Sequence, residues 1–184
     1  MSCPRTQVGR RRAAAVATGG RVGQAAQDAW RSLLAAQALI ADRIDRDLGE
    51  AADMSLAEFE VLDHLAGAEN HTIRMNELAT LVRLSPSGLT RRFDTLVRRG
   101  LVTREACEND RRGINARLTD LGLQQHSIAS VVHDRGVATY LESNLEPVDL
   151  ANLQAIGTLL AEANRRPDTS RDTSGQDRAT AQSA

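Results

Sequence analysis

The stretch Met75–Thr119 reads MNELATLVRLSPSGLTRRFDTLVRRGLVTREACENDRRGINARLT. Its apolar residues recur first at helical spacing and then, after Gly100, at strand-like spacing. This pattern predicts a short helix over Asn76–Val82, a turn at Arg83-Leu84, a second helix opening at Ser85, and a β-hairpin. The order of these elements indicates a helix-turn-helix followed by a hairpin wing.

The second helix has a clear start, an apolar stripe and a stop. Ser85 can cap the free amides, and Pro86 is tolerated at the first helical position because no donor is needed there. Gly100 is a typical residue just beyond a helix end. The stripe between these ends repeats at helical spacing and comprises Leu89, Phe93, Leu96 and Val97.

The opposite face of this helix is polar and rich in arginine. At roughly 100° per residue, Ser87, Arg91, Asp94 and Arg98 point away from the apolar stripe, with Thr90 and Arg92 on the flanks. Arginine and small hydroxyl side chains near a helix N-terminus suit the base edges and phosphates of a DNA major groove. We therefore predict a DNA-reading helix, with Ser85 included among its contacts.

The predicted hairpin carries charged residues at its turn. Two short strands, Leu101–Arg104 and Ile114–Leu118, flank a polar tip over Cys107–Gly113. Arg111 and Arg112 at such a tip could reach a minor groove, whose negative potential attracts guanidinium groups. Asp110 could hold Arg112 in a fixed pose by a bidentate pair.

In sequence order, the motifs NELA, LSPSGLTRRFDTLVRRGLV, NDRRG and ARLTDLG resemble the MarR family of winged helix-turn-helix regulators. The resemblance covers roughly Ala25 to Arg165. It implies a mainly α fold with a small β-hairpin wing and an all-helical dimerisation region. It also implies that Ser87, Thr90 and Arg91 meet the major groove, and that Asp110 orients Arg112 into the minor groove.

Charge is segregated along the chain, although the formal net charge is only −1. All basic residues are arginines; ten of them lie in residues 74–117 beside five acids, whereas residues 25–73 hold three arginines and ten acids. Basic charge therefore coincides with the predicted helix and hairpin, as a phosphate-contacting surface needs. A module that binds protein instead is the alternative, but protein interface cores are usually depleted in charge.

The remaining sequence predicts long helices and two tails. Apolar spacing indicates one helix over residues 25–48, a capped helix opening at Ser55, a strand at Ile73, and two helices within residues 120–165. We expect one domain over residues 25–165, with the DNA-binding lobe at about 55–118. Residues 1–24 are expected to form a disordered basic arm and residues 166–184 a disordered tail, because both hold few large apolar residues.

The long helices outside the reading lobe need a partner for their apolar faces. In the resembled family the first, fifth and sixth helices pack against their copies in a second subunit. A two-fold dimer would place two reading helices about one duplex turn, or ~34 Å, apart. The expectation is therefore a homodimer on a pseudo-palindromic operator, acting more readily as a repressor than as an activator. No apolar run approaches the ~20 residues of a membrane span, so we expect a cytoplasmic protein.

An effector is the least constrained prediction. Relatives commonly bind small aromatic or phenolic carboxylates between the dimerisation helices and the reading lobe. Trp30, Phe59 and His64 are candidate lining residues, with Tyr140 as a further one, although core or surface packing is the favoured interpretation for each. A redox response through Cys107 is an alternative, but the sequence shows no environment that would lower the pKa of its thiol.

Other chemistries lack their usual residue patterns. No phosphate-binding glycine loop, zinc-protease motif or nucleophile elbow occurs, so no enzyme activity is expected. His126 and His133 lie seven residues apart, as do His64 and His71. Seven residues of helix rise ~10.5 Å, too far for both rings of one pair to bind one zinc ion. We expect neither a metal nor a cofactor.

Overall fold

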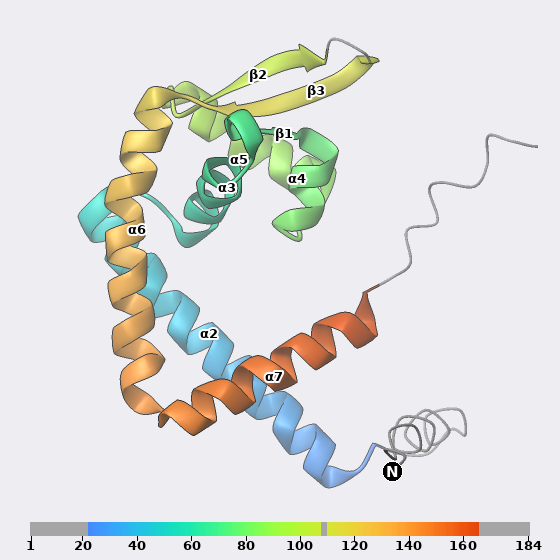
Figure 1. Ribbon diagram of the computed structural model, residues 1–184, viewed down its shortest axis with the longest axis vertical. Coiled ribbons are helices and arrows are strands. Elements are labelled where there is room, and N and C mark those ends of the chain that lie inside the picture. Colours follow the sequence, from blue (N-terminus) through green and yellow to red (C-terminus); the bar gives the residue numbers. More distant parts are fainter. Residues whose placement is uncertain (1–21, 108–109, 166–184) are drawn as a thin grey trace, which may run out of the picture. The chain divides into compact units, whose positions relative to one another are not determined.

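A computed structural model of the chain describes residues 22–107 and 110–165, with only the backbone of residues 107 and 110–112. The chain divides after Leu141 into two units, Met1–Leu141 and Glu142–Ala184. Figure 1 shows the helices and strands. In the first unit they are α2 (Gln24–Ala52), α3 (Leu56–Ala66), η1 (Glu69–His71), β1 (Thr72–Arg74), α4 (Met75–Leu81), α5 (Pro86–Arg98), β2 (Val102–Cys107), β3 (Asp110–Leu118) and α6 (Asp120–Tyr140); in the second, η2 (Glu142–Asn144) and α7 (Pro147–Asn164).

The predicted helix-turn-helix and wing are confirmed. Helices α4 and α5 are joined by a turn in which Arg83 has φ 53°. Strands β2 and β3 form an antiparallel hairpin, and β1 adds to β3, as predicted for Ile73, to give a sheet of order β1-β3-β2. The hairpin extends beyond the helices of the lobe in Figure 1. The fold is thus mainly α with one small sheet.

The core lies between α3, α4, α5 and the inner face of the sheet. Phe59, Leu62 and Leu65 of α3 are buried, as are three members of the predicted α5 stripe, Leu89, Phe93 and Leu96. Val97, the fourth member, is 36% exposed. The predicted capping box at the start of α3 is also present: Glu58 N donates to Ser55 Oγ at 3.2 Å, and Ser55 N donates to Glu58 Oε2 at 2.9 Å.

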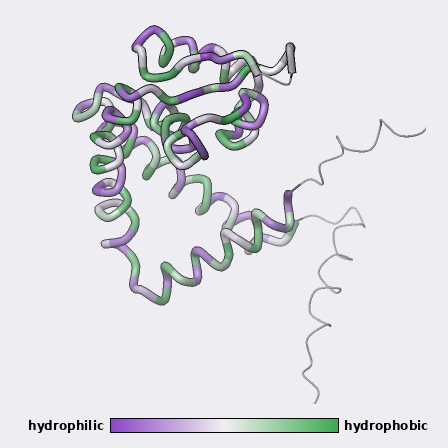
Figure 2. The backbone as a smooth tube through the Cα atoms, turned by 45° about the horizontal axis from the view of Figure 1, so that its top comes forward, coloured by the Kyte–Doolittle hydropathy of each residue, from purple (hydrophilic) through white to green (hydrophobic). Residues whose placement is uncertain are grey.

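Helix α2 is longer than expected and only its last third is buried. It continues from residue 48, where the prediction stopped, to Ala52, and Asp53 then takes a left-handed conformation that ends it. Ile44, Leu48 and Ala52 face the core and α6. Farther toward the N-terminus, Trp30 and Leu39 are exposed. Figure 2 shows such apolar residues alternating with polar ones along the long helices.

Helix α6 packs against α2 at Gly136. A Cβ placed on Gly136 would lie 2.9 Å from Ile44 Cγ1 of α2. Near its start, Gln125 Nε2 donates to the Ala52 carbonyl at 2.6 Å. Thr119 caps the start of α6, because its hydroxyl accepts from Gly122 N at 3.0 Å.

Helix α7 is the main element of the second unit. It opens at Pro147 after Glu146 and has no buried residue. Its apolar side chains Val148, Leu153, Ile156, Leu159 and Leu160 are all exposed.

Most of the predicted disordered segments lie outside the described residues. Of the arm over residues 1–24 only residues 22–24 are described, and of the tail over residues 166–184 none are. Among the helices that the structure describes, none combines the length and the hydropathy needed to cross a membrane.

Candidate nucleic-acid interface

Ser85 starts the reading helix by capping it. Its Oγ accepts a hydrogen bond from Gly88 N at 3.1 Å and lies 3.2 Å from Ser87 Oγ. Pro86 occupies the first helical position, as predicted. The cap leaves the N-terminal end of α5 exposed at Ser85 and Ser87, where the partial positive charge of a helix N-terminus favours an approaching phosphate.

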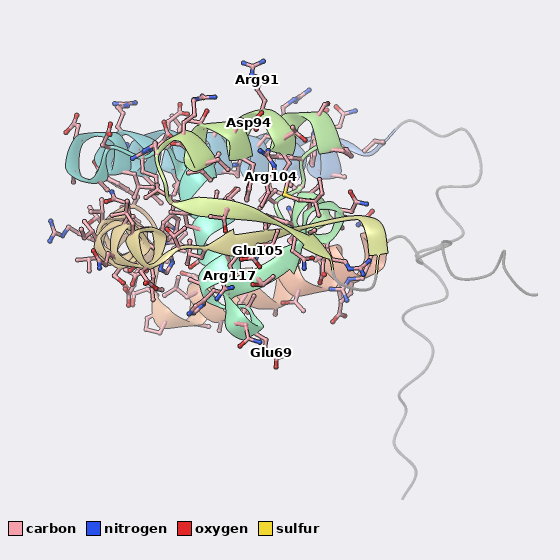
Figure 3. The ribbon with its side chains drawn as sticks, turned by 90° about the horizontal axis from the view of Figure 1, so that it is seen from above. Glu69, Arg91, Asp94, Arg104, Glu105 and Arg117 are labelled. Carbon is pink, nitrogen blue, oxygen red and sulfur yellow. The ribbon has the colours of Figure 1, made fainter. Side chains whose placement is uncertain are left out.

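The outward face of α5 carries the predicted polar residues. Ser87, Thr90, Arg91 and Arg98 are exposed, and Arg92 is half-buried. Thr90 Oγ1 donates to the Pro86 carbonyl at 2.8 Å, and Arg98 Nη2 donates to Thr95 Oγ1 at 2.9 Å. Figure 3 shows Arg91 pointing away from the helix and the body of the protein. Arg91 is thus placed to meet a ligand outside the chain.

A shallow hollow of about 700 Å³ follows this face of α5. Three arginines of α5 line it, and Ser55 and Glu58 contribute from the start of α3. Such a surface offers guanidinium groups and hydroxyls together, which are the usual partners of phosphates and base edges. The α5 residues that line it are Ser85, Ser87, Gly88, Arg91, Arg92, Asp94, Thr95 and Arg98, with Leu84 from the preceding turn.

Asp94 does not extend freely from this face as the sequence pattern suggested. Its Oδ1 lies 2.7 Å from Nη2 of Arg104 in β2, and the same guanidinium lies 5.1 Å from the centroid of the Phe93 ring. Figure 3 shows Asp94 and Arg104 facing each other between α5 and the hairpin. Arg104 was not among the residues that the sequence pattern indicated. The available signal was an arginine that alternates with Val102 and Ala106 along one side of a strand.

The wing is longer than predicted and its tip is shorter. Strand pairing reaches Cys107 and Asp110, with a register shift at Ala106 and Cys107. Asp110, Arg111 and Arg112 therefore belong to β3 instead of a seven-residue tip. The side chains of these three residues lie outside the described part of the chain, so their proposed DNA contacts remain predictions, as does a redox role of Cys107.

Arg99 attaches the C-terminal end of α5 to the junction of α2 and α3. Its Nη2 donates to the Asp53 carbonyl at 2.6 Å, and its Nη1 lies 3.7 Å from Glu58 Oε2. Asp45 of α2 meets the same junction, because its Oδ1 accepts from Leu56 N at 2.8 Å. These contacts join residues far apart in sequence, and no local pattern indicated them. They hold the reading helix against the end of α2.

The structure separates the predicted effector residues. Trp30 is 59% exposed on α2, whereas Phe59 is buried in the core and His64 is half-buried on α3. The α5 hollow contains none of the three, and neither does a smaller one near Arg99. Phe59 is instead stacked on two histidines of α6, with ring centroids 5.6 Å from His126 and 4.6 Å from His133.

The remaining titratable candidates have ordinary polar partners. His126 Nε2 lies 3.0 Å from Asp63 Oδ1, and within the described residues no three His, Cys, Asp or Glu side chains are grouped as metal ligands would be. Tyr140 donates from its hydroxyl to Asp47 Oδ2 at 2.8 Å. That hydrogen bond, with smaller contributions from burial and the Asp47 charge, raises the pKa of Tyr140.

The fold and this surface define a winged helix-turn-helix protein, and comparisons with known proteins name its family. The MarR family model matches residues 52–113. AbsC, a MarR family transcriptional regulator from Streptomyces coelicolor, is 30% identical, with a TM-score of 0.72 over 78% of this chain and 97% of AbsC. The chain therefore belongs to the MarR family of transcriptional regulators.

Two further relatives are informative. Sco3205, a MarR family transcriptional regulator from Streptomyces coelicolor solved in complex with DNA, is 29% identical, with a TM-score of 0.76 over 83% of this chain and 96% of its own. The transcriptional repressor MprA of Escherichia coli (strain K12) is 38% identical over 64 residues, which is 35% of this chain. This match spans 36% of the length of that curated relative.

Proposed function

We propose that this protein regulates transcription by binding double-stranded DNA sequence-specifically, with α5 in a major groove and the wing at a minor groove. The observation that carries the proposal is the exposed face of α5, where Arg91 follows the capped N-terminus and Arg98 lies in the last turn of the helix. A helix of this width fits a major groove. The DNA complex of Sco3205 supports the same use of the fold here.

A homodimer is the proposed working form. The first part of α2 exposes Trp30, Leu33, Leu34 and Leu39, and α7 exposes its own row of apolar residues. Monomeric proteins rarely leave large contiguous apolar patches in water. Because one reading helix covers one half-site, a two-fold pair would read a pseudo-palindrome with half-sites about one duplex turn apart.

Repression by promoter occlusion, relieved by a small effector, is the proposed mode of regulation. Occlusion requires only tight binding at the promoter, and the relative MprA is a repressor. An effector must bind the DNA-competent and incompetent conformations unequally, since otherwise it shifts no population. A small aromatic or phenolic carboxylate is the first class to screen, with the cytoplasm as the place of action.

The test is a fluorescence anisotropy titration of the full chain against DNA from its own upstream region. Unrelated DNA of equal length is the control, and both are measured at two salt concentrations. Preferential, salt-sensitive binding to the upstream DNA is expected, because phosphate contacts release counterions. Equal affinity for both DNAs at either salt concentration would contradict sequence-specific binding.

A protein-binding module is the second candidate, favoured only by the exposed apolar side chains of the long helices. It predicts no DNA binding even at low salt. The arginines of α5 weigh against it, because charged residues are depleted in the cores of protein interfaces.

A further inference from the structure

Arg104 occupies a strand position that faces the helices. Along β2, Val102 is buried, and it pairs across the hairpin with buried Leu118. Two residues on, Arg104 pairs with Ala116, which is fully buried. Since alternate residues of a strand share one face, Arg104 lies on the inner face of the sheet, where an apolar residue is the usual choice.

Two consecutive residues of α5 hold this arginine. Asp94 accepts a short ion-pair contact of 2.7 Å from Nη2, and the Phe93 ring lies 5.1 Å below Cζ. Phe93 is fully buried, so the ring that supports the guanidinium is itself fixed by the core. A charge-assisted pair combined with stacking on an aromatic face constrains a guanidinium in both direction and plane. One side chain of the wing is therefore fixed to the reading helix.

Asp94 is also an acidic group among the arginines of α5. It lines the same hollow as Arg91, Arg92 and Arg98, and its side chain is 45% exposed. An unpaired carboxylate at this place would repel DNA phosphates. The contact with Arg104 compensates that charge from the inner side of the sheet.

We propose that Arg104 is a positioning residue for DNA recognition. It fixes the wing relative to α5 and neutralises Asp94. The proposed contacts of α5 with the major groove and of the wing with the minor groove can then form at the same time. This inference rests on the proposed DNA-binding function. Arg104 itself acts through α5 and the wing, and its role is to fix their relative placement before DNA arrives.

The hairpin offers a matched control. Arg117 of β3 pairs with Glu105 of β2, with 3.2 Å between Nη1 and Oε1. This pair also joins an arginine to a carboxylate, but it lies on the other face of the sheet and links only the two strands of the wing (Figure 3). Arg117→Met and Arg104→Met therefore remove the same charge from the same hairpin, and only Arg104→Met removes a contact with α5.

The experiment measures anisotropy titrations of wild type, Arg104→Met, Asp94→Asn, the double variant and Arg117→Met against upstream and unrelated DNA. Arg104→Met is expected to weaken binding to the upstream DNA about tenfold, and Arg117→Met less than about threefold. Adding Asp94→Asn to Arg104→Met should recover part of the affinity, because it removes the uncompensated charge. Asp94→Asn alone should raise affinity for unrelated DNA and lower the preference for the upstream DNA.

Several results would overturn the proposal. One such result is that Arg104→Met binds the upstream DNA as tightly as Arg117→Met does, and another is that the double variant binds it as weakly as Arg104→Met. If Arg104→Met unfolds, Asp94→Asn still tests the proposal. An unchanged preference of Asp94→Asn for the upstream DNA over unrelated DNA would contradict the positioning role of the ion pair. Wild-type protein with no preference for the upstream DNA would refute the proposed function itself. If wild type shows the preference and the variants at Arg104 and Asp94 bind both DNAs as wild type does, only the role of Arg104 is refuted.

Discussion

Arg91 stands on the exposed face of α5, where truncation would remove the proposed DNA contact without disturbing the core. Arg91→Ala is expected to weaken binding to the preferred DNA by ~1–3 kcal/mol and to relax its sequence preference. Anisotropy titrations against the preferred site and single-base variants would measure both effects. Arg135→Ala, at an exposed arginine of α6, is the control and should leave binding unchanged. Equal affinity of Arg91→Ala and wild type would remove Arg91 from the interface.

Arg112 belongs to the wing strand β3, and a different effect is expected there. Arg112→Ala should lower affinity for all DNA sequences alike, because a groove or backbone contact depends on electrostatics. The slope of log affinity against log salt concentration should become shallower by about the contribution of one phosphate contact. The measurement is a salt series on preferred and unrelated DNA, and an unchanged slope would contradict the assignment.

At the scale of residues, the sequence was informative wherever the chemistry is local. The Ser85 cap and the Ser55 and Glu58 capping box follow from spacing alone, since their partners are three residues away. The Asp94 and Arg104 pair could not be predicted in this way. Its geometry depends on how β2 returns beneath α5, which only tertiary packing determines.

At the scale of elements, the start of α6 depends on close contact with the sheet. A Cβ on Gly122 would overlap the carbonyl oxygen of Leu101 and come within 2.7 Å of Leu118 Cδ1. Gly122→Ala is therefore expected to lower the free energy of unfolding by about 3 kcal/mol, because backbone cannot move aside cheaply. Chemical denaturation would measure the change.

Gly49 supplies the control for this prediction. It lies within α2, and a Cβ there would meet nothing within 4 Å. Gly49→Ala should raise the free energy of unfolding by roughly 0.5–1 kcal/mol, since alanine favours a helix interior. Similar effects of the two substitutions would contradict the close packing of α6 on the sheet.

The contact between α2 and α6 at Tyr140 predicts a pH effect. Its hydrogen bond to Asp47 raises the pKa of Tyr140 above the ordinary value of 10.0. The folded state therefore keeps the phenol proton to higher pH than the unfolded state does. Its stabilising contribution is complete below pH 10.0 and is lost as pH rises through the folded-state pKa.

Thermal unfolding of wild type and Tyr140→Phe, below and above pH 10.0, would test this prediction. The difference in melting temperature between the two proteins should shrink at alkaline pH. A difference that does not change with pH would show that the phenol proton is not linked to folding.

The element boundaries show where sequence patterns lose precision. The prediction ended the first long helix at residue 48, whereas α2 continues to Ala52 because these residues still pack on the core. The predicted wing strands are shorter than β2 and β3, because charged residues in a strand resemble loop residues in sequence. For α5 the cap, the apolar stripe and the stop all indicate the same helix, and its predicted ends lie within two residues of the observed ones.

At the scale of the whole molecule, the exposed apolar residues of α2 predict self-association. Wild type should sediment as a dimer at micromolar concentration. Leu39→Glu should shift it toward monomer, because a charge would have to be buried in the contact, and Leu39 is 64% exposed in the single chain. Gln37→Glu, at an exposed polar position of the same helix, is the control and should remain dimeric. A monomeric wild type would contradict the proposed dimer.

The contact between Asp94 and Arg104 also limits how this protein can evolve. Changing Asp94 alone leaves the Arg104 guanidinium without its carboxylate partner, and changing Arg104 alone leaves an uncompensated carboxylate on the proposed DNA-binding face. Either single step leaves one charged group without its partner, whereas a joint replacement leaves neither. Descendants of this chain should therefore keep both residues or lose both together, so that the two positions covary.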